Sequence, residues 1–285
     1  MDKFKRAAQA ARAPQPPQAR PAAESGPMLS GEVKRMLITA LVIFGLLAVL
    51  VTTARFWVNW WWFESMGYRQ VLTTEYLSRA VSFAAAGLLA ALFFSLNVRI
   101  ATRTGQRLGL QRPAGLFGTR PGRLLLFLLT ALVAIAAGSW GSSRWQTWRL
   151  FGTGRDFGVT DPIYGRDVAW YVFRLPAIEA VQRGILLLLL WTAVVVVLVY
   201  IVSLGLERLE WGAIPKRVTG HVLALAALAL LLAAVGYLFS MFDIVYSERG
   251  FAYGGGFTDV NVTRPVHIVL AVLSAAAAVL LLFHG

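Results

Sequence analysis

Carboxylates and arginines gather in two stretches that separate long apolar runs, and they are the side chains with the clearest potential for chemistry. Carboxylate oxygens are the ligands that Ca²⁺ and Mg²⁺ prefer, and arginine binds phosphate or balances the carboxylates. The candidate cluster comprises Asp161, Arg166, Asp167, Glu248, Arg249 and Asp259. The sequence has no Asp-x-Asp-x-Asp-Gly calcium loop, and acids beside arginines more often form helix caps and salt bridges. We therefore favour a structural role with no metal and no cofactor, and a catalytic role stays open as the alternative.

The first stretch, residues 161–176, combines acids, turn residues and aromatics. Asp161 precedes a proline and can cap a turn from which a short helix starts. Asp167 can cap a second helix over residues 168–175, whose apolar side chains share one face. This pattern predicts a short helix lying in the membrane interface. Pro176 is expected to end it, because proline has no amide with which to continue a helix.

The composition indicates that lipid, rather than water, surrounds most of this chain. Of its 285 residues, 58% are hydrophobic and only 14% are charged, which is more apolar surface than one soluble core of this size buries. The chain has no cysteine, so disulfides and thiolate sites are excluded. Three histidines lie singly at the ends of apolar runs, where we expect interfacial positions rather than a zinc site: His221, His267 and His284.

Six apolar runs each approach the roughly 20 residues that a helix needs to cross about 30 Å of hydrocarbon. They cover residues 36–54, 80–98, 124–140, 184–206, 222–242 and 266–283. None contains Asp, Glu, Lys or Arg, as expected of helices that face lipid or pack against one another. The predicted fold is therefore all-α: a transmembrane bundle of six spans over residues 36–285, with interfacial helices and ordered extracytoplasmic loops.

The distribution of charge predicts which ends of the spans face the cytoplasm. Residues 1–35 are rich in proline, alanine and glutamine and are predicted to form a disordered cytoplasmic tail. This tail and the loops at 99–123 and 207–221 carry 16 Lys and Arg against 5 acids, whereas the other three loops carry 11 against 9. Because basic flanks stay inside, we interpret the formal charge of +13 as a topology signal and expect no nucleic-acid binding.

Aromatic residues cluster after the first span, at residues 56–68. Trp and Tyr prefer the headgroup level of a membrane, where the ring is half buried and its polar edge stays wet. The predicted interfacial anchors are Trp57, Trp60, Trp61, Trp62, Trp170 and Tyr171. A cage for a cationic ligand or a platform for a sugar is the alternative interpretation of the first cluster.

Small residues in the second span predict close packing against another helix; they are Ser82, Ala86, Gly87, Ala90 and Ala91. Transport is disfavoured, because coupled carriers usually place an ionisable group or a broken helix near the membrane midplane, and the six runs offer neither. Three consecutive glycines at 254–256 predict a tight loop over the helix ends. A phosphate cradle is the alternative, although no Gly-Lys-Ser/Thr motif follows.

Three spaced motifs resemble those of the UPF0182 family of large bacterial membrane proteins. They are Trp62-Phe63 with Gly67-Tyr68, residues 161–176, and residues 246–250 with Thr258-Asp259. The resemblance extends from the first span to the last residue, and it implies about seven spans followed by a long extracytoplasmic region. This sequence stops after the sixth run, so we expect either a fragment or a shortened form. The resemblance implies no established activity and supplies no catalytic residue.

These observations together favour a structural, scaffold or assembly role in a bacterial plasma (inner) membrane, with a cytoplasmic N-terminus. The expected partners are the lipid bilayer and either another protein or a C-terminal extracytoplasmic domain. The alternative function is a membrane-embedded enzyme that acts on envelope lipid or glycan at the outer face. Transport is the third and least favoured class.

Overall fold

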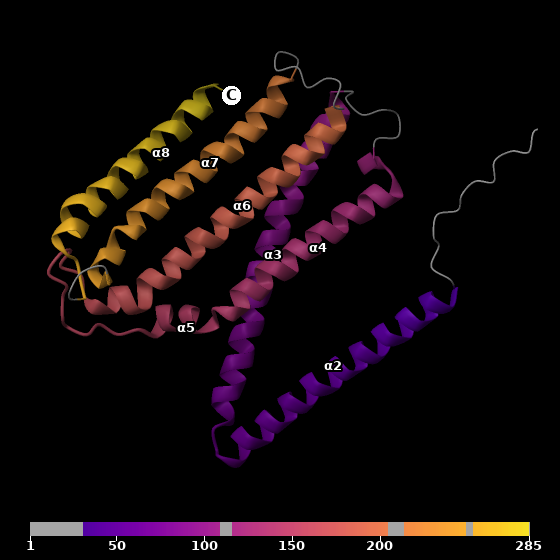
Figure 1. The fold of residues 1–285 in the computed structure, drawn as a ribbon, viewed down its shortest axis with the longest axis horizontal. Helices are drawn as coiled ribbons and strands as arrows, with labels where there is room; N and C mark the ends of the chain where they lie inside the picture. Colours follow the sequence, from indigo (N-terminus) through magenta and orange to yellow (C-terminus); the bar gives the residue numbers. More distant parts are fainter. Residues whose placement is uncertain (1–30, 109–115, 205–213, 249–252, 285) are drawn as a thin grey trace, which may run out of the picture. The chain divides into compact units, whose positions relative to one another are not determined.

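The computed structural model describes residues 31–108, 116–204, 214–248 and 253–284 (Figure 1). The chain divides into two compact units, residues 1–69 and 70–285, which are described separately. Of the predicted tail, residues 1–30 lie outside the described part. The rest of that tail is helical, because the first helix begins at Gly31, five residues before the predicted span.

Unit 1 contains helix α2 (Gly31–Ser65), which is long and apolar enough to cross a membrane and has no buried residue. The helix continues through the aromatic cluster and ends in a turn at Gly67, whose φ of 75° favours glycine. After the turn, the Arg69 guanidinium lies 4.5 Å from the centre of the Trp60 ring and 3.5 Å from the Glu64 carboxylate. These contacts fix the turn against the end of α2.

The described residues of unit 2 form five further helices of membrane-spanning length and one short α-helix. The long ones are α3 (Arg69–Arg107), α4 (Arg120–Ser143), α6 (Leu175–Leu204), α7 (Lys216–Ser240) and α8 (Arg264–His284). Together with α2 they confirm the predicted all-α fold with six helices that can span a membrane. Several of them are longer than the apolar runs, because the helices continue into their polar flanks.

Helices α3 and α4 approach closely through glycines, as the small residues of the second span predict. A Cβ atom on Gly87 would lie 2.9 Å from the Ala134 carbonyl oxygen. A Cβ atom on Gly141 would lie 2.7 Å from the Ala86 Cβ and 2.8 Å from the Ser82 carbonyl oxygen. All three distances are shorter than van der Waals contact, so only glycine permits this packing.

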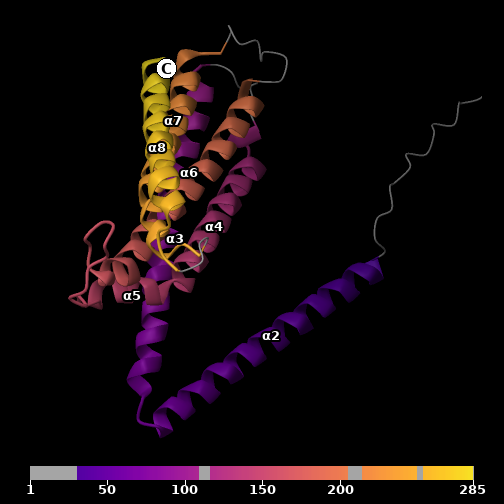
Figure 2. The same cartoon turned by 60° about the vertical axis from the view of Figure 1, so that its left-hand side comes forward.

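Helix α7 packs against both α6 and α8 (Figures 1 and 2). A buried core joins α3, α6 and α7, and it contains Ala101, Leu189, Val196, Val199, Tyr200, Leu204, Val218 and Leu225. The Tyr200 hydroxyl lies 2.9 Å from His221 Nδ1, and His221 Nε2 lies 3.2 Å from Asn97 Oδ1. His221 is therefore not an isolated interfacial residue but part of a polar link across three helices.

Residues 168–175 are helical, as predicted, but they do not form a separate helix that ends at Pro176, because the segment runs without interruption into α6. A π-helical turn, η2 (Trp170–Arg174), joins the two, and the Leu175 amide donates to the Trp170 carbonyl. The wider turn displaces the preceding carbonyls from the α-helical ladder. Pro176 is accommodated directly after it and does not end the helix.

The same arrangement precedes α8. The π-helical turn η6 (Asp259–Thr263) ends where the Arg264 amide donates to the Asp259 carbonyl, and Pro265 follows directly. A separate short helix does exist elsewhere, as α5 (Trp145–Thr153), which the sequence analysis did not predict. Figures 1 and 2 show α5, the start of α6 and the start of α8 at one end of unit 2.

Candidate functional site

Asp161 organises the loop that leads into α6. Its side chain is only 6% exposed, and the carboxylate accepts hydrogen bonds from the amides of Ile163 (2.8 Å), Tyr164 (2.6 Å) and Arg166 (2.9 Å) and from the Tyr171 hydroxyl (2.7 Å). The segment after Asp161 is a turn rather than the short helix expected. Burial by itself would raise the pKa of Asp161, but these hydrogen bonds outweigh it and hold the pKa below its ordinary value.

Asp167 performs a similar task at the other end of the same loop. Its carboxylate accepts from the amides of Phe157 (3.0 Å), Gly158 (2.8 Å) and Ala169 (2.8 Å). The bond to Ala169 caps the helical run that starts at residue 168. The hydrogen bonds from Phe157 and Ala169 are the main reason why the pKa of Asp167 is lowered. We refer to residues 157–171 as the cap loop.

Tyr164 fastens the cap loop to the end of α7. Its hydroxyl donates to the Met241 carbonyl oxygen at 2.6 Å, and its ring centre lies 4.9 Å from that of Phe242. The Arg264 guanidinium lies 5.2 Å from the centre of the same Tyr164 ring. Burial, followed by the nearby Asp161 charge, raises the pKa of Tyr164 despite Arg264, so the phenol stays protonated and remains a donor.

Trp170 and Tyr171 of the cap loop face other protein groups. The Arg166 guanidinium lies 4.4 Å from the Trp170 ring centre and 5.3 Å from that of Phe242, which are cation–π distances. Tyr171 is only 7% exposed, and its ring contacts those of Phe242 and Tyr246 edge-on. Tyr171, predicted as a lipid anchor, is thus placed in the interior of this end of the bundle.

The other candidate site residues lie in the loop between α7 and α8. Asp259 is buried and accepts from the Gly256 amide at 3.2 Å, whereas Glu248 is exposed. Arg249 lies outside the described residues. No three His, Asp or Glu side chains among the residues that the structure describes come together as a possible metal site. Asp161, Arg166 and Asp167 are therefore joined in one loop, and Asp259 supports a different one.

The tryptophans of α2 have the exposure that contact with lipid requires. Trp57, Trp61 and Trp62 are all exposed, and Trp60 is half-buried beneath Arg69. The rings of Trp57 and Trp61 lie 5.8 Å apart along one side of the helix. Their role as membrane anchors stays a prediction, which these positions are compatible with.

A second polar cluster, which the sequence analysis missed, lies where α6, α7 and α8 meet. A Glu179 oxygen pairs with the Arg183 guanidinium at 3.1 Å. The Glu179 carboxyl also lies within hydrogen-bonding reach of Asp243, and Asp243 bonds to Tyr246. Among the described residues, Glu179 Oε1 and His267 Nδ1 are buried without a hydrogen-bond partner.

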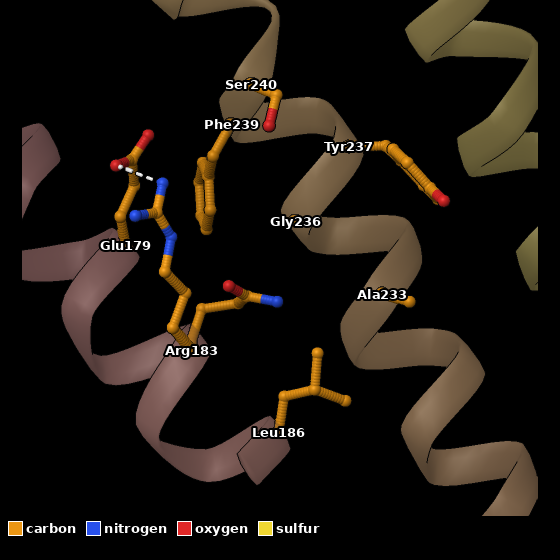
Figure 3. Close-up of a pocket in the computed structure, with 9 residues that line it drawn as sticks. Glu179, Arg183, Leu186, Ala233, Gly236, Tyr237, Phe239 and Ser240 are labelled. Carbon is orange, nitrogen blue, oxygen red and sulfur yellow. Dashed lines mark hydrogen bonds and ion pairs between the residues drawn. The ribbon is translucent and has the colours of Figure 1, made fainter.

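A groove of about 230 Å³ opens between α6 and α7 beside this cluster (Figure 3). It is lined by Glu179, Gln182, Arg183, Leu186, Ala233, Gly236, Tyr237, Phe239 and Ser240. The Gln182 amide nitrogen donates to the Leu232 carbonyl oxygen at 2.7 Å, which ties the two helices together. A Cβ atom on Gly236 would lie 2.8 Å from the same nitrogen, so this glycine leaves room for the bond.

The sequence carried a usable signal for this groove. Residues 179, 182, 183 and 186 follow the i, i+3, i+4, i+7 spacing of one helix face. The expected helix end at Pro176 hides this signal, because the four residues share a face only if the helix continues past the proline. The sequence alone does not place Asp243 beside these residues, because that placement depends on α6 and α7 being antiparallel neighbours.

These features define a polytopic helical membrane protein with an ordered, hydrogen-bonded loop end. The chain belongs to the uncharacterised protein family UPF0182, whose model matches residues 36–285. This confirms the family resemblance of the three sequence motifs. No solved structure matches the chain.

Similar proteins come from several bacteria. The chain is 31% identical over 253 residues to a UPF0182 protein of Thermobifida fusca, which covers 82% of this chain and 24% of that protein. It is 32% identical over 270 residues to one of Nocardia farcinica (89% and 26%) and 28% identical over 264 residues to one of Geobacter sulfurreducens (87% and 29%). The chain thus spans about a quarter of the length of these relatives.

Proposed function

We propose that this chain is a membrane-embedded scaffold whose cap loop holds a protein partner or a C-terminal extracytoplasmic domain. The observation that carries the proposal is the extensive hydrogen bonding of two carboxylates inside the cap loop. Asp161 and Asp167 together accept six backbone amides and one hydroxyl. Carboxylates whose lone pairs accept hydrogen bonds from the amides of their own loop order that loop, whereas a general base or a metal ligand needs a free lone pair.

Orientation and location form part of this proposal. Within unit 2, the cap loop lies at the end whose loops carry nearly balanced charge, whereas the described residues at the opposite end (99–108, 116–123 and 214–221) carry seven Lys and Arg and no acid. The positive-inside rule then places the cap loop outside the cytoplasm and the N-terminus inside. The similar proteins are bacterial, which supports the plasma (inner) membrane of a bacterium as the proposed location.

The scaffold proposal is tested by replacing Asp161 with alanine and comparing Asp156→Ala, a matched acid of the same region. Asp156 is exposed and makes one ion pair with Arg174 at 3.5 Å. In membrane vesicles, D161A is expected to expose residues 157–171 to added protease, while the helices stay protected and D156A behaves as the unmodified chain. Equal protease resistance of D161A and D156A would contradict an ordering role for Asp161.

An enzyme that acts on envelope lipid or glycan is the second candidate function. The contact between the Glu179 and Asp243 carboxyl groups favours it, because paired carboxyl groups can share the roles of acid and base. Its test is turnover of envelope lipid and glycan fractions by the purified chain and by Glu179→Gln. If the chain is an enzyme, the unmodified chain shows turnover and a folded E179Q variant loses it. If the chain is a scaffold, neither shows turnover.

A further inference from the structure

A basic surface lies at the end of unit 2 opposite the cap loop. Leu108 after α3, Phe117 before α4 and Ile214 before α7 all pack against the buried core of α3, α6 and α7, which holds these segments together. Figure 1 shows the end of α3 and the start of α7 at the same end of unit 2. Exposed cations on these segments form the basic surface: Arg99, Arg103, Arg107, Arg120, Arg123, Lys216 and Arg217.

The basic surface is not neutralised by the described part of the protein. The described residues at this end contain no acid, and none of the seven cations forms an ion pair or a cation–π contact with a described residue. At the cap-loop end, by contrast, Arg79, Arg174 and Arg183 each pair with a carboxylate. Glu207 and Glu210 lie outside the described residues. Even if each of them offset one cation, five of the seven charges would be left for a partner outside the chain.

Three of the cations lie at the depth of the lipid phosphates. Arg99 directly follows the apolar run at 80–98, Arg123 directly precedes the run at 124–140, and Arg120 lies three residues before Arg123. A helix rises about 1.5 Å per residue, whereas the headgroup zone on each side of a bilayer is about 5–8 Å thick. All three side chains therefore start within that zone, where phosphate is the anion that they meet.

The other four cations extend the basic surface into the adjacent water. Arg103 and Arg107 follow Arg99 at intervals of four residues, which places the three on one side of α3. Lys216 and Arg217 lie about 7–9 Å along the helix from the run that starts at residue 222. Because charge acts over about 8–10 Å at physiological ionic strength, these four cations are still attracted by the phosphates of the membrane.

We propose that the basic surface binds anionic phospholipids, such as phosphatidylglycerol, and retains them at this end of the bundle. The arginines at headgroup depth bind the phosphate oxygens through paired N–H donors, and the outer cations add attraction over a longer range. A zwitterionic lipid carries an ammonium group near its phosphate, which weakens this attraction. A nucleic acid in the water would be separated from the three cations at headgroup depth, so a lipid fits the surface better. The cations thus act in the folded protein as well as in setting its orientation.

The test is binding of defined lipids to the delipidated full chain in detergent, measured by native mass spectrometry. Phosphatidylglycerol is expected to bind at least about 10-fold more tightly than phosphatidylcholine of the same acyl chains, because each cation near an anionic headgroup contributes about 5-fold. Equal binding of the two lipids would show that the cations serve only as a topology signal and would overturn the proposal. Displacement of phosphatidylglycerol by an RNA oligonucleotide would also overturn it, as would equally tight binding of free glycerophosphoglycerol.

Variants locate the binding on the basic surface. The double variant Arg99→Gln with Arg123→Gln is expected to lower the preference for phosphatidylglycerol by at least about 5-fold. The matched control is Arg149→Gln with Arg155→Gln, which removes two exposed arginines at the cap-loop end. An equal loss in both double variants would show that net charge alone, rather than the basic surface, attracts the lipid. If the first variant does not fold, the comparison of the two lipids on the unmodified chain still decides the question.

Discussion

Tyr171 and Asp161 form a buried hydrogen bond between a phenol and a carboxylate at 2.7 Å. Bonds to charged groups contribute about 1.5–3 kcal/mol to stability, so Tyr171→Phe is expected to lower the free energy of unfolding by that amount. The control is Tyr253→Phe, because Tyr253 is 84% exposed. Thermal unfolding in detergent measures both variants, and an unchanged midpoint for Y171F relative to Y253F would show that the bond contributes nothing.

The pH below which the cap loop loses stability follows from Asp161 and Asp167. Their pKa values are lower in the folded chain than in the unfolded one, so the unfolded state takes up protons first as the pH falls. The stabilisation is therefore complete above about pH 4, the ordinary pKa of an aspartate, and is lost below it. We expect Trp fluorescence to be constant from pH 8 to 5 and to change below pH 4. In Asp161→Ala this acid transition should be weaker, and an identical transition in the variant would contradict the assignment.

At the scale of elements, helix packing depends on the glycines of α4. Gly141→Val would place atoms against Ala86 and the Ser82 carbonyl, where even a Cβ lies within 2.8 Å. Separating the two helices should cost at least about 2 kcal/mol. Gly45→Val on α2 is the control, since a Cβ there meets nothing within 4 Å. Similar unfolding midpoints for G141V and G45V would rule out close packing at Gly141.

The elements also show how far sequence reasoning reaches. Hydropathy found the six long helices, because a 20-residue apolar run has few other solutions in a membrane. The small residues from Ser82 to Gly87 correctly predicted close packing. Asp167 was recognised as a cap, because capping is a local effect. The π-helical turn before Pro176 was not predicted; in the structure it packs against α5, and its Trp170 and Tyr171 rings contact Phe242.

The site residues show the same difference between what a local sequence pattern predicts and what depends on helix packing. Asp161 was identified from its neighbours in the sequence, but the buried hydroxyl of Tyr171 became its partner only through the fold. The contact of Glu179 with Asp243 joins residues 64 positions apart on antiparallel helices, and no local pattern encodes it. Sequence therefore indicated residues that order their own loop and missed those that gain a partner by helix packing.

At the scale of the whole molecule, the absence of cysteine allows each end of the spans to be probed with one introduced thiol. Thr153→Cys lies at the cap-loop end and Gln106→Cys at the end of α3, and both side chains are exposed. A membrane-impermeant maleimide is expected to label T153C in intact cells and Q106C only after lysis. The reverse pattern would invert the proposed orientation and place the cap loop in the cytoplasm.

The central claim is that the cap loop is an ordered structure held by its own carboxylates. Hydrogen–deuterium exchange of the chain in lipid nanodiscs tests it most directly, because each bonded amide is protected. The amides concerned are those of Phe157, Gly158, Ile163, Tyr164, Arg166 and Ala169. We predict slow exchange for peptides that contain them, and fast exchange for residues 163–166 in Asp161→Ala. Fast exchange across residues 157–171 of the unmodified chain would contradict the account.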